Sequence, residues 1–206
     1  MPAALLALLC AAAPAAPQDG AALAREVQAF YERTRDLEAG FVQTYTYAAG
    51  GRRQVSRGTL RVKKPGKLRW DYEAPEKKTI VVNGTRLTQY EPEENQVYLD
   101  EHFDASAMSA AVTFLLGRGS LEKEFVPSAD AAGRLVLVPR VPDARVAEVV
   151  LTVGERGEVT STRVTDASGN VNELVFDHIR RDVGLDDRVF VLDLPKDVER
   201  VTAPGR

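Results

Sequence analysis

The sequence lacks several residues on which common active sites depend. It has one cysteine, Cys10, and two histidines, His102 and His178, among 206 residues. Cys10 falls within the apolar start of the chain, so the rest can form no disulfide, thiolate metal site or cysteine nucleophile. The histidines stand in no metal-ligand spacing, and no nucleophile motif accompanies them. We therefore expect no catalytic residue, no metal and no cofactor, and the sequence points away from an enzyme.

Charge of one dominant sign is also missing. The formal net charge is −3, and 27 basic side chains are interleaved with 30 acidic ones. A nucleic-acid-binding protein would need a concentrated positive field, so we expect no nucleic-acid partner. The sequence has no P-loop, dinucleotide fingerprint, Gly-x-Ser-x-Gly elbow or His-Glu-x-x-His motif. Asp182, Asp186 and Asp187 surround Gly184 in a spacing that fits no EF-hand loop, which favours a solvated turn over a calcium site.

The first eighteen residues contain no charged side chain. Their apolar run has the length of a signal-peptide core and is too short to span a bilayer, and a small-x-small motif ends at Ala15. We predict a signal peptide over residues 1–15, export from the cytoplasm, and a single domain over 16–206. A lipoprotein signal would also end at a cysteine, but Leu9 stands where that signal needs a small residue before Cys10.

Hydrophobic periodicity predicts one helix followed by a β-rich chain. Asp19 is a plausible N-cap, and the apolar residues that follow repeat at helical spacing over residues 20–36. Turn signals at Pro65-Gly66 and Asn83-Gly84 separate segments that alternate apolar and polar residues. Strands are expected at 59–63, 67–73, 79–82, 86–90, 95–101, 134–140, 146–153, 158–166, 171–179 and 189–193. This pattern predicts a mainly β (α+β) fold built on one curved antiparallel sheet, rolled toward a barrel.

One segment, residues 105–117, interrupts the strands and carries no charge. Its larger apolar residues fall around a short helix: Met108, Val112, Phe114 and Leu115. A helix that is apolar all round should be buried, and the concave face of the sheet is the available place. From the residues alone, the segment could be fixed core or a movable cover, and both interpretations stay open.

A second apolar set lies on the alternating strands and should share one face of the sheet. Its members are Leu60, Val62, Leu68, Trp70, Ile80, Val82 and Tyr90. Such residues usually form a core, and they line a cavity only where the barrel is not filled by its own side chains. Periodicity does not separate these two possibilities.

The stretch from Phe41 to Leu99 resembles the periplasmic outer-membrane lipoprotein carrier family, LolA. The resemblance lies in an ordered set of motifs: Phe41-Val42-Gln43, Gly58-Thr59-Leu60-Arg61-Val62-Lys63-Lys64-Pro65, Trp70, Pro75, Asn83-Gly84 and Tyr90. The preceding helix and the end at Phe190-Val191-Leu192-Asp193-Leu194-Pro195 fit as well. Each motif is weak by itself, but the ordered set is fairly specific.

The resemblance implies an unclosed β-barrel with helices covering its mouth as a lid. It implies a periplasmic chaperone that holds lipoprotein acyl chains in a hydrophobic cavity without hydrolysing ATP. The single domain and the mixed surface charge suggest a monomer. Cargo would come from an inner-membrane ABC transporter and pass to an outer-membrane acceptor. The cavity would be lined by the alternating apolar set, and residues 105–117 would belong to the lid. The family's lid-latching basic residue corresponds to Lys64, where this sequence departs from arginine.

Two related functions remain as alternatives. A lipid- or lipoprotein-sensing envelope protein of the same fold would normally carry a second domain for its protein partner, and a single domain is expected here. A membrane-anchored acceptor would need Cys10 to be lipidated.

Overall fold

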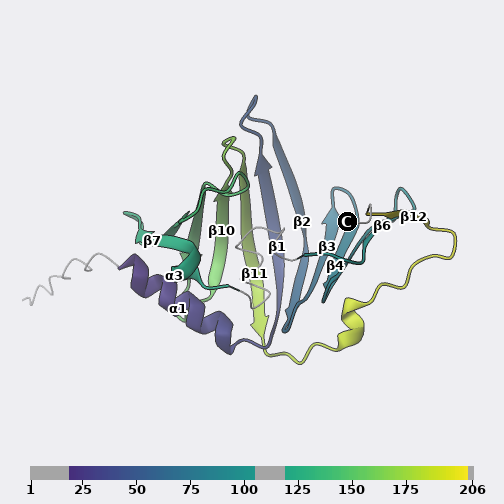
Figure 1. The fold of residues 1–206 in the computed structure, drawn as a ribbon, viewed down its shortest axis with the longest axis horizontal. Coiled ribbons are helices and arrows are strands. Elements are labelled where there is room, and N and C mark those ends of the chain that lie inside the picture. The colour runs from purple at the N-terminus through teal and green to yellow at the C-terminus, as the bar shows by residue number, and fades with distance from the viewer. Residues whose placement is uncertain (1–18, 105–118, 204–206) are drawn as a thin grey trace, which may run out of the picture.

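The computed structural model describes residues 19–104 and 119–203, which form one large β-sheet with its longest helix against one side (Figure 1). The predicted signal peptide, residues 1–15, lies outside the described residues, as do residues 105–117 with Met108, Val112, Phe114 and Leu115. The helices are α1 (Gly20–Arg33), α3 (Leu121–Glu124) and the 3-10 helix η2 (Asp187–Phe190). The strands are β1 (Asp36–Thr46), β2 (Arg53–Lys63), β3 (Lys67–Ala74), β4 (Lys78–Asn83), β5 (Arg86–Glu91), β6 (Gln96–Asp100), β7 (Phe125–Ala129), β8 (Leu135–Pro139), β9 (Glu148–Val153), β10 (Val159–Thr165), β11 (Val171–Arg181) and β12 (Glu199–Thr202).

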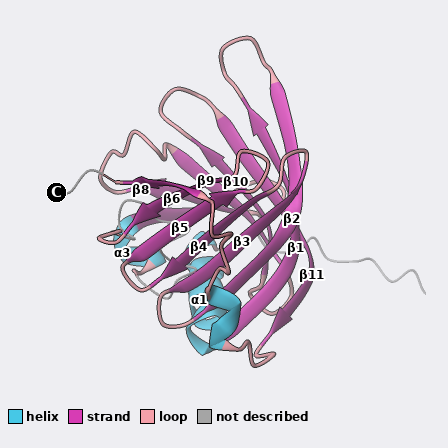
Figure 2. Ribbon diagram, turned by 90° about the vertical axis from the view of Figure 1, so that its right-hand side faces the viewer, coloured by secondary structure: helices cyan, strands magenta, loops and turns pink. Residues whose placement is uncertain are grey.

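The twelve described strands form one sheet that does not close on itself. Their order is β12-β6-β5-β4-β3-β2-β1-β11-β10-β9-β8-β7, and every neighbouring pair is antiparallel except β12 with β6. Figure 2 shows how strongly the sheet curves. The prediction of a mainly β fold with a curved, unclosed antiparallel sheet is confirmed. The site described below lies on the inner, concave face of this sheet.

Helix α1 begins where the sequence predicts and ends three residues earlier. The carboxylate of Asp19 caps its start by accepting from the Ala21 N–H at 3.0 Å. At the other end, the Thr34 hydroxyl donates to the Phe30 carbonyl at 2.8 Å, and the Thr34 backbone is extended. Because this cap satisfies a carbonyl of the last turn, the chain can leave the helix and enter β1 directly.

The predicted strand at 189–193 is wrong. Residues 187–190 form η2, capped by the Asp186 carboxylate, which accepts from the Arg188 N–H at 2.8 Å. Phe190 is 1% exposed and Val191 is 63% exposed. The apolar residues that suggested a strand therefore belong to a segment that packs on the sheet without pairing with a strand. Strands β1, β7 and β12 were not among the expected strand ranges.

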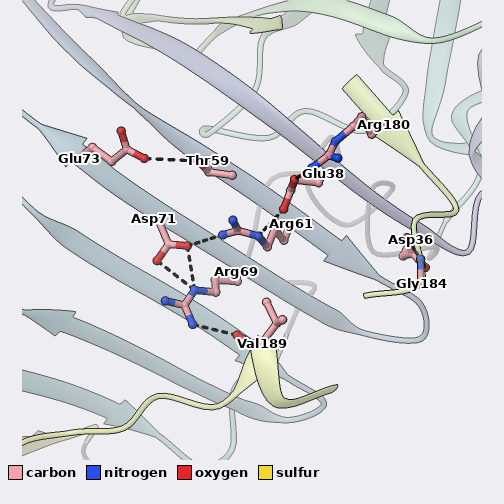
Figure 3. A network of polar contacts seen from close by, with 10 residues as sticks. All are labelled: Asp36, Glu38, Thr59, Arg61, Arg69, Asp71, Glu73, Arg180, Gly184 and Val189. Carbon is pink, nitrogen blue, oxygen red and sulfur yellow. Dashed lines mark hydrogen bonds and ion pairs between the residues drawn. The ribbon is translucent and has the colours of Figure 1, made fainter. Parts of the chain in front are cut away.

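The outer face of the sheet carries a network of ion pairs (Figure 3). Arg61 bridges Glu38 and Asp71 at 2.6 and 2.9 Å, and Arg69 contacts Asp71 at 2.8 Å. Burial by itself would raise the pKa of Glu38, but hydrogen bonds from Arg180 and Arg61 outweigh it and lower that pKa. These charged side chains thus have partners on the outer face, and the apolar side chains that alternate with them point to the inner face.

The segment after β11 crosses to the other end of the sheet, where β12 pairs with β6 (Figure 1). The Asp36 carboxylate accepts from the Val183 N–H at 2.8 Å near the start of this crossing. The Arg69 guanidinium donates to the Val189 carbonyl at 2.9 Å further along. These contacts hold the crossing segment on the outer face and leave the inner face to α1.

Candidate functional site

An apolar cavity of about 100 Å³ lies between α1 and the inner face of the sheet. Tyr31 of α1 forms part of its wall, together with Leu121 of α3 and Phe125 of β7. Strands from both halves of the sheet supply the rest: Leu37, Ala39, Leu60, Trp70, Leu137, Val149, Leu151, Val159, Thr162, Val164, Asn172, Leu174, Phe176 and Ile179. The long hydrocarbon wall suits an apolar ligand, because few polar groups interrupt it.

The predicted cavity residues are brought together on this inner face, with one exception. Leu60 and Trp70 line the cavity, and they pair directly across β2 and β3. The next members form the adjoining core with Phe41 and Leu174: Val62, Leu68 and Val82 are buried there, and Ile80 is half-buried against it. The structure therefore places these six residues in one apolar layer, partly as cavity wall and partly as core.

Tyr90 does not belong to this layer, so its predicted position in the cavity is wrong. It pairs with Thr79 of β4, whereas Ile80 pairs with Gln89. Neighbouring residues of a strand point to opposite faces, so Tyr90 lies on the face opposite Ile80. The residue of β5 that joins the apolar cluster is Leu87.

Aromatic packing fixes the position of Trp70. The Phe41 ring meets the Trp70 ring edge-on, with the centroids 5.5 Å apart, and Tyr72 stacks parallel to Trp70 at 6.1 Å. Burial raises the pKa of Tyr72 to about 12, and a hydrogen bond with Gln43 opposes that shift. Burial thus favours the neutral form of the Tyr72 phenol.

Lys64 connects the β2–β3 turn to α1. Its ammonium donates to the Tyr31 backbone carbonyl in the last turn of the helix. Burial lowers the pKa of Lys64, while Glu32 and Asp182 act in the opposite direction. A half-buried cation on a helix carbonyl is a contact that displacement of α1 would have to break.

Sequence analysis did not identify the part of the cavity wall that strands β8 to β11 supply. Phe41 and Phe176 pair directly across β1 and β11, and strands β8 to β10 contribute buried leucines and valines. The alternation of these strands was visible in the sequence. What was missing was the pairing of β1 with β11, since that long-range contact decides which residues face α1.

A more open hollow of about 460 Å³ lies at the far end of the same strands. Its lining is polar and aromatic, and includes Tyr45, Tyr47, Gln54 and Glu93. Within 19–104 and 119–203, no three side chains gather as metal ligands. Nor is any helix in these two ranges both long and apolar enough to cross a membrane. Of the two hollows, the cavity between α1 and the sheet has the apolar wall that suits an apolar ligand.

Comparisons with known proteins agree with this geometry. The family model described as "Outer membrane lipoprotein carrier protein LolA" matches residues 32–193. An outer-membrane lipoprotein carrier protein of Methylobacillus flagellatus is 29% identical over 174 residues, which cover 82% of this chain and 83% of that protein. One of Chromobacterium violaceum is 29% identical over 205 residues, covering 96% of each. Among solved structures, an uncharacterized conserved protein from Thermus thermophilus shares the fold, with a TM-score of 0.53 and 13% identity over 89% of this chain and 98% of that one.

Proposed function

This chain belongs to the LolA family of outer membrane lipoprotein carrier proteins, and on that premise we propose that it carries lipoproteins by enclosing their acyl chains between α1 and the sheet. The observation that carries the proposal is the apolar cavity itself. Exposing hydrocarbon to water costs roughly 0.8 kcal/mol per CH₂, so a chain of about sixteen carbons represents on the order of 12 kcal/mol. Lipidated cargo therefore needs a protein shield to cross an aqueous compartment.

The closed cavity is smaller than its proposed ligand. Its volume is about 100 Å³, whereas pockets that enclose a whole organic ligand measure about 300–1,000 Å³. Loading therefore requires the walls to separate, and α1 is a wall element that is not hydrogen-bonded into the sheet as the strands are. An empty carrier that stays closed also avoids displaying a large apolar patch. The contact between Lys64 and Tyr31 is the proposed clasp of the closed form.

The family resemblance extends the proposal to the partners. Cargo would be received from an inner-membrane ABC transporter and delivered to an outer-membrane acceptor, with the periplasm as the place of action. The carrier has no catalytic part in this proposal, because movement down a gradient of affinity needs only binding and release. The relatives' names support the lipoprotein cargo.

Binding of a fluorescent fatty-acid probe tests the cavity directly. We expect saturable binding and a change in Trp70 emission, since Trp70 is the only tryptophan and lines the cavity. A water-soluble dye of similar size without an alkyl chain serves as the control and should not compete. A protein that gives neither saturation nor an emission change would have a filled core, and the proposal would fail.

Variants of Lys64 test the clasp. Arginine presents several donors in a rigid fork, so Lys64→Arg should hold the Tyr31 carbonyl more firmly. Uptake of the probe should weaken by about 1 kcal/mol, roughly fivefold. Lys64→Leu removes the donor, and should leave the protein folded, retain lipid more strongly and slow its transfer to acceptor vesicles. Probe titration and a transfer assay measure both effects.

The exposed Lys196 offers a matched control for these variants. Lys196→Arg and Lys196→Leu should leave affinity and transfer rate unchanged. If the Lys64 variants behave like the Lys196 variants, Lys64 is an ordinary half-buried charge and not a clasp.

A further inference from the structure

Two polar side chains in the cavity wall have no hydrogen-bond partner. Among the residues in the described part of the chain, Trp70 Nε1 and Thr162 Oγ1 are the buried side-chain nitrogen and oxygen atoms without one. Both residues line the same apolar cavity. A buried polar group without a partner is costly, and native proteins usually satisfy such groups. Two of them on one cavity wall therefore point to a ligand that supplies the missing partner.

The residues that pair directly with Trp70 and Thr162 across the strands carry no polar side chain. Trp70 is 8% exposed and its ring is held between Phe41 and Tyr72. Thr162 of β10 pairs with Leu174 on one side and Leu151 on the other, and neither neighbour has a polar side chain. The two groups lie on strands from opposite halves of the sheet, so they can contact different parts of one ligand.

The chemistry of the groups restricts what that ligand is. An indole N–H is a donor only, and a threonine hydroxyl can donate as well as accept. A buried water needs two to four polar partners, and besides Trp70 and Thr162 the described cavity lining has polar side chains only at Tyr31 and Asn172. A carbonyl oxygen needs no partner other than a donor, and an acyl chain is a hydrocarbon that ends in a carbonyl. An ester or amide carbonyl is uncharged, which suits a cavity whose lining, among the described residues, includes no cationic side chain.

We propose that Trp70 and Thr162 donate hydrogen bonds to the ester or amide carbonyl oxygens of bound acyl groups. The cavity then distinguishes an acyl chain from an alkyl chain of the same length. This inference rests on the proposed carrier function and names the subsite within it. It also gives the two unpaired groups a purpose that a closed, purely structural core would not.

The test compares two lipids of equal chain length in competition with the fluorescent fatty-acid probe. Dipalmitoylglycerol carries ester carbonyls, and its dihexadecyl ether analogue lacks them. The unmodified protein should bind the ester more tightly, by roughly three- to tenfold for one or two hydrogen bonds. Thr162→Val and Trp70→Phe should each reduce the ratio of ester to ether affinity, because only ester binding loses a hydrogen bond. For Trp70→Phe the readout is the emission of the probe, since the intrinsic tryptophan signal is removed.

Thr160→Val is the matched control on the same strand. Its hydroxyl already donates to the Thr152 carbonyl at 3.3 Å, and it does not line the cavity. This variant should keep the ester preference. A second readout uses the lipid-free protein, in which Thr162→Val removes an unsatisfied group and should raise the melting temperature by about 2–4 °C.

The outcomes separate the inference from the function on which it rests. If the unmodified protein binds neither lipid, the proposed carrier function fails. If it binds ester and ether equally, or if Thr162→Val and Trp70→Phe keep the full preference, the carbonyl subsite is wrong and the carrier function stands.

Discussion

Replacing Phe41 with alanine is expected to destabilise the protein by about 3–5 kcal/mol, the usual cost of removing a buried phenyl ring. Phe41 is 2% exposed, and its ring contacts both Trp70 and Tyr72 edge-on. It belongs to the core that adjoins the cavity, so the loss would leave a void that rigid strands cannot close. Chemical denaturation followed by far-ultraviolet circular dichroism measures the free energy of unfolding.

Val42→Ala is the matched control, because the neighbouring residue points to the other face. Val42 is 42% exposed and pairs with Val175, which is 56% exposed. Its truncation should change stability by no more than about 0.5 kcal/mol. Equal effects at positions 41 and 42 would contradict the assignment of inner and outer faces on which the cavity depends.

Gly58→Ala is the second change with a large expected effect, about 3 kcal/mol of lost stability. A Cβ at Gly58 would lie 1.8 Å from the Asp71 carbonyl oxygen and 3.0 Å from the Tyr72 Cα. These are backbone atoms of β3, so no side chain can turn away to relieve the clash. The pairing register of β2 with β3 shifts between Arg57 and Gly58, which brings the two backbones this close. Melting temperature and denaturation midpoint both report the loss.

Gly58 also stands opposite Phe41 in the β1–β2 pairing. The absence of a side chain there leaves room for the Phe41 ring in the aromatic layer. Ser56→Ala, two residues earlier on the same strand, is the control, since this position already carries a Cβ; it should have little effect. A Gly58→Ala protein as stable as the Ser56→Ala protein would show that the strands can separate at this point, against the close approach described here.

Most of the fold could be predicted from short-range sequence signals. The Asp19 cap, the Pro65-Gly66 turn and the Asn83-Gly84 hairpin are short-range features whose chemistry is complete within a few residues. Alternation identified the strands that have one apolar and one polar face. It failed at residues 189–193, where burial of Phe190 comes from packing on the outer face and no strand pairs with the segment.

The candidate site was harder to predict from the sequence, because it depends on contacts between distant parts of the chain. Leu60 and Trp70 could be assigned to one face from periodicity, but Tyr90 was assigned to the wrong one. It was grouped with the alternating apolar residues, whereas the register set by the two-residue Gly84-Thr85 loop puts Leu87 there. Thr162 gave no signal at all, since a threonine on a strand is ordinary until the cavity around it is known.

The central claim is that this protein carries lipoproteins by their acyl chains, and native mass spectrometry tests it most directly. The protein would be recovered from the periplasm without detergent, in cells that produce a tagged lipoprotein and in cells whose tagged lipoprotein lacks the acylated cysteine. We predict a one-to-one complex with the acylated form and none with the unacylated form. Recovery of the carrier empty in both cells, or bound equally to both forms, would contradict the account.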